Sequence, residues 1–281
     1  MVYMFKIEDL LGLFPDENIK KMLVYSYFLS QESDKDLSDG VFEQLLLLKK
    51  QDPNINIILD PSKEKSYFSP DENTIYINNL SIETFFHELT HLLSYNYLSF
   101  QVPNEYDSFK RSFMTNKDNT SLIVQFLDLC ERKKVELVQS FSDEDVNVYD
   151  NNLNEMNDAQ QEPQSRQLDL IHMMEDIVDS IYDGQSFTYG LVSIKDNNSN
   201  AFKTKKTFGH GCEYFSSSDY QFEEILANYQ AIKLIDPNNE LFALLKNIIG
   251  NDFVSFLDER CCEMCGTSLK TKIDINNIAK R

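Results

Sequence analysis

The chain has 281 residues and a formal net charge of −20, and its pI is near 4.5. An acidic surface repels nucleic-acid phosphates and anionic lipid headgroups, so we expect neither as a partner, whereas a neutral or basic protein surface is compatible with it. The composition is 42% hydrophobic with five irregularly spaced cysteines, which predicts a sizeable core and reduced thiols rather than a disulfide framework.

The N-terminal sequence and the hydropathy bear on location. The first residues lack the basic, apolar and small-residue regions of a secretory signal, and no apolar run is long enough to span a membrane. We therefore expect a monomer without a membrane span, which stays in the cytoplasm unless a specialised secretion system exports it.

The N-terminal third begins with helical patterns. In residues 7–30 the apolar positions recur with helical spacing on both sides of Pro15, which interrupts the pattern. Residues 31–40 are polar and predict a connection. Residues 41–50 predict a second helix, and its four leucines at 45–48 are too apolar to be exposed.

Two short strands are predicted next. Residues 56–59 and 74–77 are rich in isoleucine and are bounded by proline, aspartate and asparagine. The second strand leads almost directly into the helix described below. A strand beside a reactive cleft binds an extended peptide when its edge is free, and we expect residues 74–77 to do so, although an ordinary core strand fits the same pattern.

Residues 81–98 predict a buried helix with two histidines on one face. Ser81 is a suitable N-cap, and Glu83 places a negative charge in the first turn. His87 and His91 are four positions apart, so their imidazoles lie one turn apart and can bind one zinc ion. Glu88 stands where it can take a proton from a water molecule on that ion. The segment matches the HExxH pattern of zinc metalloproteases.

The middle of the chain divides into two predicted lobes. Residues 96–120 predict loop with short helix, and residues 121–138 predict a helix. Residues 143–166 are acidic, rich in Asn and Gln and poor in apolar residues, which predicts a mobile insertion. We therefore expect an N-terminal lobe over 1–142, the insertion over 143–166 and a C-terminal lobe over 167–281, whose first helix spans 168–181.

A catalytic zinc takes three protein ligands, so a third His, Asp or Glu has to come from elsewhere in the chain, and the second lobe offers the best candidates. Residues 185–208 predict a hairpin, followed by a glycine-flanked His210 that is one candidate. Residues 219–232 predict a helix that contains Glu223 and Glu224. These two side chains point about 100° apart on a helix, so only one of them can face the metal.

The segment Glu224-Ile225-Leu226-Ala227-Asn228 resembles the E-x-x-A-[DN] element of the gluzincin metalloproteases. The resemblance implies that Glu224 binds zinc and that Asn228 contacts a motif histidine, with Glu223 as the alternative ligand. The long separation between His91 and Glu224 departs from the family and implies a large insertion. The resemblance also implies an oxyanion donor near the cleft, for which His210, Tyr214 and Tyr220 are candidates. The metzincin pattern is absent, because neither Gly nor His follows His91 closely.

The chain as a whole is similar to compact gluzincin-type effector proteases that some bacterial pathogens deliver into host cells. The motifs involved cover at most a quarter of the chain: the strand at 74–77, the HELTH helix, the G-H-G-x-x-Y loop and the EEILAN helix. The resemblance implies an α+β, mostly helical, zincin-like fold with a small sheet beside the HExxH helix and a helical second lobe.

The same resemblance implies a zinc-dependent endopeptidase with one Zn²⁺ ion. Such a protein is secreted into the host cytosol without a classical signal peptide and acts on a host protein, for which signalling proteins and cytoskeletal ones such as actin are precedents. Two alternatives stay open. One is a non-catalytic helical host-interaction protein with a chance HExxH, and the other is a zinc enzyme that hydrolyses a small molecule or a non-peptide amide.

Overall fold

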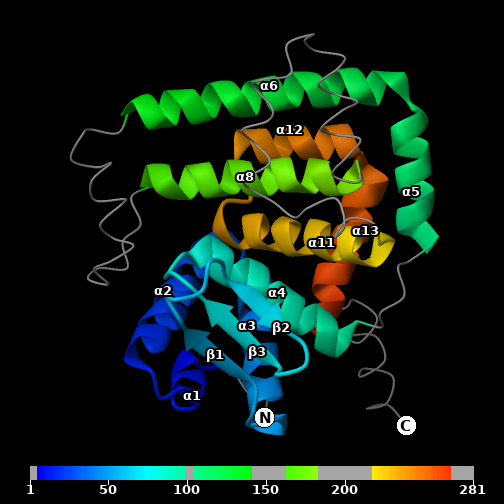
Figure 1. Cartoon of the computed structure of the whole chain (residues 1–281). Coiled ribbons are helices and arrows are strands. Elements are labelled where there is room, and N and C mark those ends of the chain that lie inside the picture. The colour runs from blue at the N-terminus through cyan, green and yellow to red at the C-terminus, as the bar shows by residue number, and fades with distance from the viewer. Residues whose placement is uncertain (1–4, 99–103, 141–162, 183–216, 267–281) are drawn as a thin grey trace.

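A computed structural model of the chain describes residues 5–98, 104–140, 163–182 and 217–266. The described part is mostly helical and includes one small sheet, as expected (Figure 1). The N-terminal elements are α1 (Ile7–Leu11), α2 (Glu17–Ser33), α3 (Lys35–Gln51), β1 (Asn56–Leu59), β2 (Tyr67–Ser69), β3 (Thr74–Ile77) and α4 (Ile82–Tyr97). The later elements are α5 (Asn104–Thr115), α6 (Lys117–Ser140), α8 (Pro163–Ile181), α11 (Ser218–Ile235), α12 (Glu240–Ile249) and α13 (Asn251–Met264).

The first helices confirm the predicted break at Pro15 and correct the prediction for residues 31–40. Asp16 begins α2, and its side chain accepts hydrogen bonds from the backbone N–H groups of Asn18 and Ile19. No polar connection follows α2. Asp34 alone separates α2 from α3, because its extended backbone ends one helix while its carboxylate accepts from the N–H of Leu37 in the next. Leu47 is also 39% exposed, whereas the other three leucines at 45–48 are buried as expected.

The sheet contains both predicted strands and a third that was not predicted. The strand order is β1-β3-β2, with β3 parallel to β1 and antiparallel to β2. Thus β3 is the central strand, and both of its edges are already hydrogen-bonded. The expectation that residues 74–77 offer a free edge to a peptide is therefore wrong, and the core-strand interpretation is right. Thr74, Ile75 and Ile77 are buried accordingly.

Helix α11 lies at the centre of the molecule, between α4 and α8 (Figure 1). Nearly every residue of α11 from Gln221 to Ile235 is buried, which is the pattern of a helix surrounded by protein on all sides. Its neighbours come from both predicted lobes, and the buried apolar residues of the two lobes belong to one cluster. This arrangement brings a helix from late in the chain against the HExxH helix.

The segment after α4 is more regular than expected. Residues 96–120 were predicted as loop with short helix, but α4 extends to Tyr97, α5 begins at Asn104 and α6 already begins at Lys117. Tyr106 and Phe113 are the buried residues of α5. The helix predicted at 121–138 is part of α6, in which Leu122 is 43% exposed.

Several predicted features fall wholly or partly outside the described residues. They are the hairpin at 185–208, the loop with His210 and Tyr214, and residues 143–162 of the acidic insertion. The insertion was expected to run to residue 166, whereas α8 begins at Pro163. The helices predicted at 168–181 and 219–232 are present as α8 and α11.

Candidate metal centre

Helix α4 holds the two motif histidines on a firmly packed segment. Ser81 is its N-cap, with Oγ accepting a hydrogen bond from the N–H of Thr84. Five apolar residues of the helix are fully buried: Phe85, Phe86, Leu89, Leu92 and Leu93. His87 and His91 face the same direction because they are four positions apart on the helix, and their Nε2 atoms lie 3.0 Å apart.

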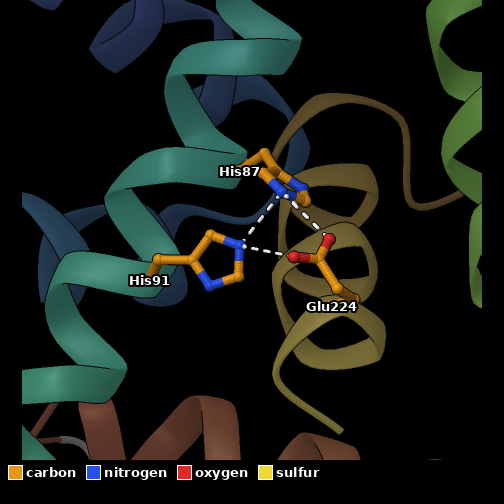
Figure 2. A group of neighbouring side chains, drawn as sticks. All are labelled: His87, His91 and Glu224. Carbon is orange, nitrogen blue, oxygen red and sulfur yellow. Dashed lines mark hydrogen bonds and ion pairs between the residues drawn. The ribbon is translucent and has the colours of Figure 1, made fainter. Parts of the chain in front are cut away.

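Glu224 of α11 completes a group of three possible metal ligands (Figure 2). One carboxylate oxygen lies 3.4 Å from Nε2 of His87, and the other lies 3.4 Å from Nε2 of His91. The side chain of Glu224 is only 1% exposed. Within the described ranges, no other group of three or more His, Cys, Asp and Glu side chains meets the same spacing. Glu223, the alternative ligand, is not part of this group.

The spacing within this group fits a single tetrahedral zinc ion. Ligand atoms about 2.0–2.1 Å from a tetrahedral zinc lie about 3.3–3.4 Å from one another. The two imidazole nitrogens lie 3.0 Å apart, and each lies 3.4 Å from a different oxygen of Glu224, so each of these separations is close to that value. One ligand atom from each of the three residues lies within 4.8 Å of the other two. Two imidazole nitrogens and one carboxylate are also the donor set that zinc takes in many hydrolases, and three donors leave a fourth position open.

The charges around the centre favour a cation. Burial lowers the pKa of His87, but the carboxylates of Glu224, Glu88 and Asp176 outweigh that effect and raise the pKa to about 9. Burial has the opposite effect on a carboxyl group and raises the pKa of Glu223, while His91 opposes this shift. Carboxylates thus gather around two imidazoles in a largely buried place, and an ion of charge +2 would neutralise much of that negative charge.

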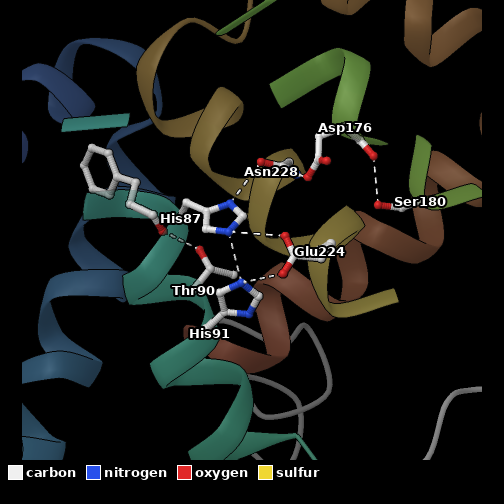
Figure 3. A network of polar contacts seen from close by, with 8 residues as sticks. His87, Thr90, His91, Asp176, Ser180, Glu224 and Asn228 are labelled. Atoms are coloured by element: carbon white, nitrogen blue, oxygen red, sulfur yellow. Dashed lines mark hydrogen bonds and ion pairs between the residues drawn. The ribbon is translucent and has the colours of Figure 1, made fainter. Parts of the chain in front are cut away.

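His87 is oriented by a contact with α11 and, beyond it, with α8. Its Nδ1 lies 2.9 Å from Oδ1 of Asn228, which is 2% exposed. The Nδ2 of Asn228 donates to a carboxylate oxygen of Asp176 at 2.8 Å (Figure 3). The contact between Asn228 and a motif histidine follows the expectation from the E-x-x-A-[DN] element. Asp176 was missed, because nothing in the local pattern of α8 shows which side of that helix faces α11.

Glu88 and Tyr220 are the other predicted site residues within the described part. Glu88 is 7% exposed, and its charge contributes to the raised pKa of His87. Tyr220 lies one turn before Glu224 on α11 and is 50% exposed. The remaining oxyanion candidates, His210 and Tyr214, lie outside the described residues.

No cysteine within the described ranges joins this centre. Cys130, Cys261, Cys262 and Cys265 are reduced thiols. Burial raises the pKa of Cys261 and Cys265, so both favour the thiol form rather than the thiolate that binds metals.

Comparisons with protein-family models, with curated proteins and with solved structures each found no match. Within the described ranges, no helix combines the length and the apolar character that crossing a bilayer requires. The function has to be argued from the centre itself.

Proposed function

We propose that the protein is a zinc-dependent endopeptidase whose ion is held by His87, His91 and Glu224. The observation that carries the proposal is the convergence of these three side chains, whose ligand atoms lie within 4.8 Å of one another, with a carboxylate, Glu88, beside the first histidine. The comparisons neither add to the proposal nor oppose it.

The chain supplies the remaining chemical groups. When bound, zinc supplies Lewis acidity, which lowers the pKa of a water molecule and polarises the carbonyl of the scissile bond. Glu88 lies three positions before His91 and therefore shares its side of α4. In the proposed reaction Glu88 accepts the proton of the attacking water and returns it to the leaving nitrogen. The C–N bond breaks, and a carboxylate and an amine are released.

The substrate class is proposed on the resemblance alone. Effector proteases of the gluzincin type act on host proteins, so a signalling or cytoskeletal protein of a host cell is the proposed target. The net charge of −20 favours a target with a neutral or basic surface around the cleaved segment.

Replacement of the proposed base separates catalysis from metal binding. We expect Glu88→Gln to retain zinc, since all three ligands remain, and to lose at least about a hundredfold in peptide hydrolysis, the lower range of a general base. The measurement is incubation of both proteins with a host-cell lysate, followed by mapping of new peptide termini, with metal analysis of the purified samples.

His91→Ala is the matched control, because it removes a ligand and leaves Glu88 in place. It should lose both the zinc and the activity. Cleavage by Glu88→Gln at the wild-type rate would exclude the mechanism. A wild-type protein that neither binds zinc nor cleaves any lysate protein would instead support the non-catalytic interaction protein.

A further inference from the structure

A partly buried hydrogen-bonded chain runs from α8 to the proposed metal centre. Asp176 of α8 accepts a hydrogen bond at 2.8 Å from Nδ2 of Asn228, and Oδ1 of Asn228 lies 2.9 Å from Nδ1 of His87. Figure 3 shows the three side chains in this order, with Glu224 on the opposite side of the His87 ring. Each residue belongs to a different helix, so the chain joins α8, α11 and α4.

The carboxylate of Asp176 determines which groups donate and which accept along the hydrogen-bonded chain from Asp176 to His87. An ionised carboxylate only accepts hydrogen bonds, so Asn228 has to turn its NH₂ group toward Asp176. The carbonyl oxygen of Asn228 then faces His87, and an oxygen can only accept. Nδ1 of His87 must therefore carry the hydrogen. In the neutral ring this leaves the lone pair on Nε2, which is the atom that faces Glu224 and His91.

We propose that Asp176 is a positioning residue of the metal centre, which selects the metal-binding tautomer of His87 by orienting the amide of Asn228. Asp176 touches neither the ion nor a substrate. It acts through Asn228, and the inference rests on the metal centre proposed above.

The packing of α8 makes this role possible. Ile177 and Val178, next to Asp176, are fully buried, and α8 packs along α11. Ser180 bonds to the backbone oxygen of Asp176 and fixes the local helix. Without an acceptor at position 176, the amide of Asn228 is free to reverse. Its NH₂ group would then face Nδ1 of His87 and favour the tautomer with hydrogen on Nε2, which blocks the lone pair needed for zinc.

Zinc affinity tests this role without reference to activity. We expect Asp176→Ala to weaken Zn²⁺ binding by about 10–100-fold, the usual effect of losing a residue that orients a ligand. Asp176→Asn retains an acceptor oxygen for Nδ2 of Asn228, so it should bind Zn²⁺ within about threefold of wild type. The measurement is competition for Zn²⁺ with a chromophoric chelator, on the full chain. Should Asp176→Ala fail to fold, Asp176→Leu removes the acceptor while filling the volume.

Glu175→Ala is the matched control. Glu175 neighbours Asp176 on α8 and pairs with Lys134 of α6 at 2.9 Å, so its loss also removes a polar link between helices but leaves the chain to His87 intact. It should not change zinc affinity. Two results would overturn the inference: wild-type affinity in Asp176→Ala or Asp176→Leu, or an equal loss in Asp176→Asn and Asp176→Ala. If wild type binds Zn²⁺ no better than His91→Ala, the metal centre itself is wrong, and the role of Asp176 is wrong with it.

Discussion

Glu83 is a fully buried carboxylate in the first turn of α4, one turn before His87. One carboxylate oxygen lies 3.2 Å from Nε of Arg166, and the other accepts a hydrogen bond from Oγ of Ser81. Arg166 also donates to the hydroxyl of Tyr25. Burial raises the pKa of Glu83, while Arg166 and Ser81 oppose the shift. The residue was expected only to complement the helix dipole, and its burial gives Arg166 a structural role.

Removal of Arg166 should leave this carboxylate buried without its partner. We expect Arg166→Met to lower the free energy of unfolding by about 3–5 kcal/mol at neutral pH, the usual cost of breaking a buried ion pair from one side. Because the pKa of Glu83 in the folded state is raised further in this variant, its deficit relative to wild type should shrink as the pH falls. Denaturant unfolding at about pH 8 and about pH 5 measures both effects.

A second substitution separates charge from packing. Glu83→Gln in the Arg166→Met background removes the unpaired charge, so it should restore most of the lost stability and abolish the pH dependence of the difference. A deficit that is the same at both pH values would show that packing of the arginine, rather than its charge, stabilises the wild type.

At the scale of elements, Asp34 is the only residue between two long helices. Its carboxylate caps α3, and its backbone N–H donates to the carbonyl of Ser30 at the end of α2. We expect Asp34→Ala to lower the free energy of unfolding by about 0.5–2 kcal/mol, the range for loss of an N-cap. Asp34→Asn retains the capping oxygen and should cost much less. Thermal or urea unfolding distinguishes the two, and equal losses would assign the effect to the charge of Asp34 instead.

The elements that were predicted correctly are those with strong local patterns. The α4 helix has a capping serine and a dense apolar face, and α11 has apolar residues at helical spacing, so both are visible in the sequence. The three-residue strand β2 was missed, and α5 was predicted only as a short helix without bounds, within residues 96–120. Short strands depend on their partners for stability, and the polar surface of α5 hides the burial of Tyr106 and Phe113.

The residues of the proposed site likewise divide into those that local spacing predicts and those that depend on tertiary packing. The spacing of His87 and His91 predicts two ligands, because one helix carries both. Residue spacing alone left Glu223 and Glu224 as alternatives, and only the resemblance to a known element favoured Glu224. Asp176 was out of reach, since its place depends on how α8 packs against α11, which is a property of the tertiary structure.

At the scale of the whole molecule, the proposed ion would join helices that are far apart in the chain. His87 and Asn228, which lie at the junction of α4 and α11, are 141 positions apart. An ion bound only by the folded state stabilises it by about 2.7 kcal/mol when free zinc is a hundred times its dissociation constant. We expect Zn²⁺ to raise the unfolding temperature of wild type by about 5–10 °C at that concentration.

The matched variant for this measurement is His91→Ala, which should show no such rise. Differential scanning fluorimetry with Zn²⁺, with Mg²⁺ and with a chelator gives the comparison. A similar rise in His91→Ala would mean that Zn²⁺ acts at another place on the protein.

Strand β3 already has a hydrogen-bonded neighbour on each side, and this affects which proteins the proposed protease would cleave. In the part of the chain that the structure describes, a visiting backbone can extend the sheet only along the outer sides of β1 and β2, and β2 has just three residues. An edge strand of three residues offers few main-chain hydrogen bonds, which are the contacts that any polypeptide can make regardless of its side chains. If the proposed peptidase activity holds, contacts with particular substrate side chains would have to provide most of the binding free energy. The protease would then cleave few of the proteins that it encounters.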